Sequence, residues 1–169
     1  RPIALFCSPY RIWCKARLQM VEQWESLHSR PYFACGPSRS ATDVVWRQAL
    51  RAEKSAVSGG HAAALLWDLQ SFFDTVDLDL LWHKAVKVGF PLDILRVALN
   101  AYTSPRAVQT SLGRADPVRP SRGVAPGCTF AKALVHLYYL EDIDAFVDRF
   151  PHIDVDIYID DITLSASHQ

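Results

Sequence analysis

Residues 153–165 decide the fold, and they read IDVDIYIDDITLS. Hydrophobic side chains at 153, 155 and 157 alternate with more polar ones at 154, 156 and 158, which is the period-two pattern of a strand with one buried face. A second β-prone run, ITLS at 162–165, follows directly after Asp160 and Asp161. The sequence therefore predicts a β-hairpin with the two aspartates at its tip, where adjacent charges are costly without a counter-ion.

A third carboxylate, Asp68, ends the short apolar run AAALLW at residues 62–67. This run predicts a buried strand. Carboxylate oxygens at the ends of neighbouring strands can bind Mg²⁺, which prefers hard oxygen ligands, and two such ions ~3.5–4 Å apart can hold the attacking and leaving oxygens of a phosphoryl transfer. Asp68, Asp160 and Asp161 are thus candidate metal ligands, although their spacing alone fits turn and cap residues equally well.

Helices are predicted around these strands. They cover residues 10–28, 41–57, 78–88, 91–102 and 128–149. Ser40 and Asp43 resemble a capping box at the start of the second helix, and Asp77 can cap the third. Residues 106–112 are strand-like, and the segments rich in Pro and Gly, 31–39 and 114–127, are loops or broken strand. The pattern predicts an α+β fold, with a small, mainly antiparallel sheet covered by helices on one face.

The composition is that of an ordinary globular protein, since half of the 169 residues are hydrophobic. Net charge is zero but unevenly distributed. Residues 1–60 carry nine basic and four acidic side chains, net +5, and residues 61–169 carry nine and fourteen, net −5. A basic first third and an acidic remainder fit a phosphate-contacting part beside a carboxylate-rich metal site, and they fit a chance partition of surface charge equally.

Cysteine usage and hydropathy indicate an intracellular protein, without distinguishing nucleus from cytoplasm. The four cysteines form no CxxC pair and no zinc-ligand cluster, so we expect buried or semi-buried free thiols. No apolar run reaches the ~18 residues of a membrane span, and the start shows no signal-peptide pattern, so we expect no membrane partner. The chain begins without Met, and we expect its natural N-terminus to lie further upstream.

Four segments, in order, resemble the motifs of reverse transcriptases. YIDD at 158–161 resembles their Tyr-x-Asp-Asp box, and DLQSFFDTV at 68–76 resembles their first palm motif. RGVAPGC at 122–128 is similar to the Arg-Gly-Val-x-Gln-Gly-Cys segment, and RPIAL at 1–5 is similar to the Arg-Pro-Ile-x-Leu finger motif. The resemblance covers essentially the whole chain and is to the non-LTR, LINE-like retrotransposon enzymes.

This resemblance implies an RNA-directed DNA polymerase, a nucleotidyltransferase with a right-hand architecture. Residues 1–60 would be partial fingers, and residues 61–169 a palm that ends just after the Tyr-x-Asp-Asp hairpin, with the thumb absent. The implied partners are an RNA template, a DNA or RNA primer and dNTPs, and the implied cofactor is a pair of Mg²⁺ ions, with Mn²⁺ as a substitute. Because relatives need the missing parts to grip the duplex, we expect little processive activity from this fragment alone.

The resemblance also assigns roles to the carboxylates and their neighbour. Asp68 and Asp160 would be the main metal ligands, with Asp161 a weaker one, and the carbonyl of Leu69 would help to bind the metal on the triphosphate. Asp74 receives no metal role.

Nucleotide and template would contact five further residues. Arg1, Phe73 and Gly127 would bind the nucleotide, and Arg122 and Gly123 the template or primer. Phe73 would be a steric gate, because its ring would lie beneath the sugar, where a 2′-hydroxyl would clash. Only the motif supports this assignment, because without it Phe73 would be interpreted as an ordinary core aromatic.

One departure from the family pattern keeps other functions open. Pro126 stands where the family has Gln, and Pro cannot donate a hydrogen bond to nucleotide or template. Residues 129–132 read TFAK in place of the usual Pro-Leu-Ser-Pro. The alternatives are a catalytically inert, nucleic-acid-binding remnant of a retroelement or intron maturase, or an RNA-dependent RNA polymerase. Phe at position 73, where those polymerases commonly have a second Asp, favours deoxynucleotides.

Overall fold

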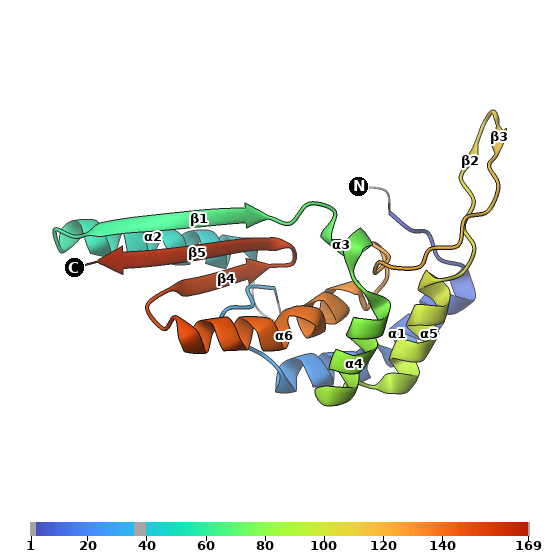
Figure 1. The fold of residues 1–169 in the computed structure, drawn as a ribbon, viewed down its shortest axis with the longest axis horizontal. Helices are drawn as coiled ribbons and strands as arrows, with labels where there is room; N and C mark the ends of the chain where they lie inside the picture. Colours follow the sequence, from blue (N-terminus) through green and yellow to red (C-terminus); the bar gives the residue numbers. More distant parts are fainter. Residues whose placement is uncertain (1–2, 36–39, 169) are drawn as a thin grey trace. The chain divides into compact units, whose positions relative to one another are not determined.

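The computed structural model describes residues 3–35 and 40–168. Arg1, predicted to bind the triphosphate, lies outside them. In chain order the described elements are α1 (Ser8–Leu27), α2 (Ala41–Val57), β1 (His61–Asp68), α3 (Phe72–Thr75), α4 (Leu78–Lys87), α5 (Leu92–Tyr102), β2 (Gln109–Thr110), β3 (Gly113–Arg114), α6 (Ala131–Arg149), β4 (Asp154–Tyr158) and β5 (Asp161–His168). The predicted α+β class with a small antiparallel sheet is confirmed (Figure 1).

The chain forms two compact units. One comprises residues 1–24 and 71–138, and the other residues 25–70 and 139–169. The units do not follow the predicted boundary at residue 60, because each is assembled from two separate stretches of chain. The division into fingers and palm stays a prediction.

The second unit is built on the predicted hairpin. Its sheet has the order β1-β5-β4, and both strand pairs are antiparallel (Figure 1). Val155 and Ile157 are buried, as their alternation predicted, and each stabilises the sheet by about 1.5–3 kcal/mol. Helix α2 begins with the predicted cap, in which the Ser40 N–H donates to the Asp43 carboxylate at 2.6 Å. This helix contacts all three strands.

The far edge of β4 is covered by an extended segment. The Ala34 N–H donates to the Ile157 carbonyl at 2.8 Å, and the Ile157 N–H donates to the Tyr32 carbonyl at 2.7 Å. The Tyr32 hydroxyl donates to Asp144 of α6 at 2.8 Å, and Arg30 binds the same carboxylate. Burial raises the pKa of Asp144, but hydrogen bonds from Arg30 and Tyr32 outweigh burial and lower the pKa below its usual value. These contacts fix α6 to the edge of the sheet.

Residues 62–67 form a strand, as predicted, but the prediction that this strand is buried is wrong. Strand β1 forms as expected, but all eight of its residues are exposed, including Leu66 at 70% and Trp67 at 50%. The reason is position, because β1 pairs with β5 on one side and has no other strand partner among the described residues. An apolar run makes a strand suitable for burial, but it does not specify whether another element of the protein packs over that strand.

The period-two pattern was also misleading at Asp156. A strand with one buried face would leave its polar side chains toward solvent, but only 1% of the surface of Asp156 is exposed. The cause is α2, which covers the face that the polar side chains share and brings two arginines onto the carboxylate. Burial of a charge requires such partners.

The first unit is mainly helical. Its core includes Trp24, whose indole N–H donates to the Val88 carbonyl at 3.0 Å and whose ring meets Phe90 edge-on at 5.1 Å. Asp77 caps α4 as predicted, by accepting from the N–H groups of Asp79 and Leu80. The predicted strand over 106–112 is reduced to the two residues of β2, paired with β3.

The cysteines are free, as predicted, although Cys7 is exposed and the other three are buried. Burial raises the pKa of the Cys14 thiol to about 11, which keeps it protonated and unreactive at neutral pH. None of the helices described is long and apolar enough to span a bilayer.

Candidate active site

The hairpin turn holds two of the predicted carboxylates at the end of the sheet. Strand β4 ends at Tyr158 and β5 begins at Asp161, so Ile159 and Asp160 form a two-residue turn. Ile159 has a φ of 62°, a left-handed conformation that a β-branched residue rarely adopts. Such strain costs about 1–3 kcal/mol and is typical of functional sites.

The third carboxylate lies directly across the sheet from this turn. Asp68, the last residue of β1, is the antiparallel partner of Asp161, the first residue of β5. Directly opposite residues share a face, with Cβ atoms about 4.5–5.5 Å apart. Both side chains line a cavity of about 470 Å³ between the sheet and α2, together with Tyr158 and Val44. The strand register thus brings Asp68 and Asp161 together, and Asp160 follows in the turn.

The donor set fits a hard divalent cation, since it consists of carboxylate oxygens at the adjoining ends of two strands. The Leu69 carbonyl, also predicted to bind metal, follows Asp68 in the chain. Within residues 3–35 and 40–168, no group of three or more His, Cys, Asp or Glu side chains is arranged so that it could hold a metal ion. Like charges in such proximity repel, and a bound cation would relieve that repulsion.

Phe73 and Gly123 meet in the mainly helical unit. The Val124 N–H donates to the Phe73 carbonyl at 2.7 Å, and the Gly123 N–H donates to the Val76 carbonyl at 2.8 Å. A Cβ on Gly123 would lie 3.0 Å from the Asp74 carbonyl oxygen and 3.1 Å from that of Phe73. The glycine is therefore needed for the close approach that anchors the short helix α3, which carries Phe73.

Gly127 has the same kind of role beside the N-terminal segment. The Ala4 N–H donates to the Pro126 carbonyl at 2.8 Å. A Cβ on Gly127 would lie 2.6 Å from Cγ2 of Ile3 and 2.9 Å from the Ala4 carbonyl oxygen. Ile3 and Ala4 of the first motif therefore pack against the motif at 122–128. Pro126 has no side-chain donor, but its carbonyl accepts the hydrogen bond from Ala4. Arg122 is exposed and can reach a ligand in solution.

Comparison with known families decides the class of the protein. The family described as reverse transcriptase (RNA-dependent DNA polymerase) matches residues 1–169, the entire chain. The chain belongs to the reverse transcriptase family. No curated protein sequence matches it.

Solved structures agree at the level of the fold of a reverse transcriptase. Telomerase from Candida albicans, in complex with the TWJ fragment of telomeric RNA, is similar with a TM-score of 0.64 and 14% identity, covering 93% of this chain and 30% of that chain. Apo telomerase from Candida tropicalis gives a TM-score of 0.62 and 11% identity, covering 94% and 31%. The chain thus spans about 30% of the length of these structures.

Sequence reasoning missed Tyr139, which lies near the carboxylates of the candidate site. Tyr139 of α6 is buried, and burial, together with the charges of Asp160 and Asp161, raises the pKa of its hydroxyl. A neutral phenol therefore lies within electrostatic range of the turn. Nothing in the local sequence indicated this, because Tyr139 lies 21 and 22 residues before the two aspartates.

Replacing Gly123 with Ala is expected to destabilise the protein by about 1–3 kcal/mol through overpacking against the backbone of α3, measured by urea unfolding. The added methyl group would press on Asp74 and Phe73. Gly59→Ala is the matched control, because Gly59 also has a positive φ, 71°, but a methyl group added there would have no atom within 4 Å. Equal losses in the two variants would show that the contact with α3 contributes nothing.

Proposed function

We propose that this chain is the catalytic part of an RNA-directed DNA polymerase of the non-LTR retrotransposon type. It would add dNTPs to a primer 3′-hydroxyl on an RNA template. The observation that carries the proposal is the strand register that places Asp68 opposite Asp161, with Asp160 in the adjoining strained turn. In a chain of the reverse transcriptase family, this arrangement supports a carboxylate site for phosphoryl transfer.

The metal site would use Asp68, Asp160, Asp161 and the Leu69 carbonyl as ligands for two Mg²⁺ ions, with Mn²⁺ as a substitute. When bound, such ions lower the pKa of an attacking hydroxyl and neutralise charge on a leaving pyrophosphate. The protein itself contributes positioning, because β1 and β5 hold the carboxylates on a rigid sheet before substrate arrives. Preorganised charge of this kind supplies most of the rate in phosphoryl transfer.

Nucleotide binding would fall to residues outside the sheet. Phe73, five residues after Asp68, would exclude the ribose 2′-hydroxyl, and Arg1 and Gly127 would contact the triphosphate. Arg122 and Gly123 would contact the template or primer. In the same proposal, residues 1–60 belong to the fingers and residues 61–169 to the palm of a right-hand polymerase.

The decisive experiment is primer extension by the full natural chain that carries residues 1–169, with an RNA template, a DNA primer, dNTPs and Mg²⁺. We expect template-directed extension that stops when EDTA removes the cation and that is much weaker with ribonucleotides. Binding of the template-primer without any extension would contradict the proposal and support an inert nucleic-acid-binding remnant. Preferential use of ribonucleotides would indicate an RNA polymerase instead.

A further inference from the structure

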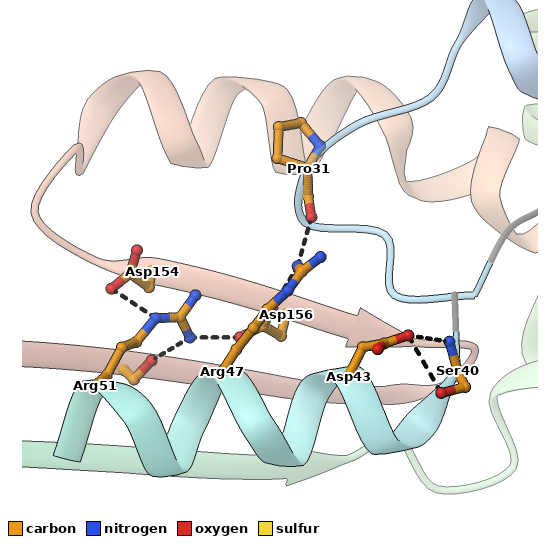
Figure 2. A network of polar contacts seen from close by, with 8 residues as sticks. Pro31, Ser40, Asp43, Arg47, Arg51, Asp154 and Asp156 are labelled. Carbon is orange, nitrogen blue, oxygen red and sulfur yellow. Dashed lines mark hydrogen bonds and ion pairs between the residues drawn. The ribbon is translucent and has the colours of Figure 1, made fainter. Parts of the chain in front are cut away.

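An ion-pair network centred on a buried carboxylate joins α2 to the strand that leads into the hairpin turn (Figure 2). At its centre is Asp156 of β4, whose side chain is fully buried. Arg47 Nη1 donates to Asp156 Oδ1 at 3.2 Å, and Arg51 Nη1 donates to Oδ2 at 2.5 Å. Both carboxylate oxygens are thus bound, each by a different arginine.

The two arginines also bind groups around Asp156. Arg47 Nη1 donates to the Pro31 carbonyl at 2.9 Å, and Arg51 Nη1 donates to the Ser165 hydroxyl at 3.1 Å. Arg51 Nε pairs with Asp154 at 3.1 Å. Arg51 therefore connects α2 to both strands of the hairpin, since Asp154 lies in β4 (Figure 2) and Ser165 is its partner in β5.

Local geometry explains why these side chains meet. Arg47 and Arg51 are four residues apart on a helix, so they lie on the same face of α2. The forked guanidinium of Arg51 contacts Asp156 through Nη1 and Asp154 through Nε, which the point-like ammonium of Lys cannot reproduce. The contacts are therefore directional and fix the position of α2 along the strands as well as its distance from them.

The network is continuous with the candidate metal site. Asp156 precedes Tyr158 by two residues on the same face of β4, and its partner across the hairpin, Thr163, is two residues after Asp161. Asp156, Thr163, Asp161 and Asp68 line the same cavity beneath α2. A shift of α2 relative to the sheet would thus also displace the carboxylates, because only one or two strand residues separate them from the network.

We propose that Asp156, Arg47 and Arg51 are positioning residues that hold α2 on the hairpin and thereby set the placement of Asp160 and Asp161 relative to Asp68. This inference rests on the proposed function only in taking those carboxylates as metal ligands. A buried ion pair often adds little net stability compared with apolar residues, and its best-attested use is to fix one arrangement of elements among several. The network suits that use because it specifies register.

Asp156→Asn in the full natural chain tests the proposal, because Asn keeps the shape and loses the charge. We expect a folded protein whose affinity for Mn²⁺, measured by electron paramagnetic resonance of the free ion, falls by about 10- to 100-fold, as when the partners of metal ligands are removed. We also expect kcat for single-nucleotide incorporation to fall by about 10- to 100-fold, with the KM for dNTP unchanged. If Asp156→Asn does not fold, Arg51→Lys, which keeps the charge, is expected to show the same pattern more weakly.

Asp144→Asn is the matched control. It breaks another Asp–Arg pair of the same unit. Asp144 of α6 binds Arg30 and Tyr32, which both lie outside the hairpin strands. It should lower the unfolding temperature and leave Mn²⁺ affinity unchanged.

Two results would overturn the inference. If Asp156→Asn or Arg51→Lys lowers stability but leaves Mn²⁺ affinity and kcat at the wild-type values, the network only stabilises the fold. If wild-type protein binds Mn²⁺ but extends no primer, the proposed function is wrong. The positioning role can then still be tested by the Mn²⁺ affinity of the variants. Wild-type protein that binds no Mn²⁺ would overturn both.

Discussion

Asp160→Asn is expected to abolish nucleotide incorporation, with a loss of at least about 10³-fold in kcat, while the fold persists. Asp160 stands in the two-residue turn, outside the paired residues of β4 and β5. Replacing one carboxylate oxygen by an amide nitrogen removes its negative charge and should leave the strand pairing in place. The measurement is single-nucleotide primer extension at saturating Mg²⁺, with circular dichroism to verify folding.

Asp93→Asn is the control for this variant. The Asp93 side chain is 94% exposed on α5, in the other unit, and its substitution should leave extension unchanged. A near-normal rate in Asp160→Asn would rule out Asp160 as a metal ligand. Asp161→Asn in the same assay shows which of the two aspartates matters more for incorporation. The sequence motif favours Asp160, whereas the strand register places Asp161 directly opposite Asp68.

Phe73→Val is expected to admit ribonucleotides, raising the ratio of rNTP to dNTP incorporation by about 10- to 100-fold. A smaller side chain would remove the clash with the 2′-hydroxyl and leave the deoxyribose contact largely intact. The Phe73 carbonyl accepts from the Val124 N–H, and this bond does not involve the half-buried ring, so the backbone should stay fixed in the variant. Competition between rNTP and dNTP at a single template position gives the ratio directly.

The neighbouring ring provides the control for sugar selectivity. Phe72 lies on the same short helix, but its ring packs against Tyr138 with centroids 6.0 Å apart. Phe72→Val should cost stability and leave the rNTP to dNTP ratio unchanged. If Phe73→Val also leaves the ratio unchanged, the steric-gate role is refuted, and if both variants change it, the effect comes from α3 as a whole.

Local patterns predicted the local structure well. The alternation at 153–157 predicted β4, the Ser40–Asp43 pair predicted the start of α2, and Asp77 predicted the cap of α4. Each of these rests on residues within a few positions of one another, where hydrogen bonding and side-chain periodicity act directly. The same reasoning placed Asp160 at the hairpin tip, although its motif and not its spacing suggested a metal role.

Features that depend on distant residues could not be predicted in this way. Asp156 is buried because Arg47 and Arg51, over 100 residues earlier in the chain, reach its carboxylate. Their four-residue spacing on α2 was a usable signal, but it does not say which acid they would bind. Likewise, the pairing of Asp68 with Asp161 follows from strand order, which a single sequence does not specify.

The outer edge of strand β1 has a consequence for how the protein behaves in concentrated solution. Along the edge that faces away from β5, β1 pairs with no other strand among the described residues, and Leu66 and Trp67 add apolar surface there. Such an edge is a template for pairing with another extended chain, including a second copy of itself. Residues 1–169 in isolation will therefore be prone to concentration-dependent self-association and precipitation, and a charged side chain introduced on β1 away from Asp68 will improve their solubility.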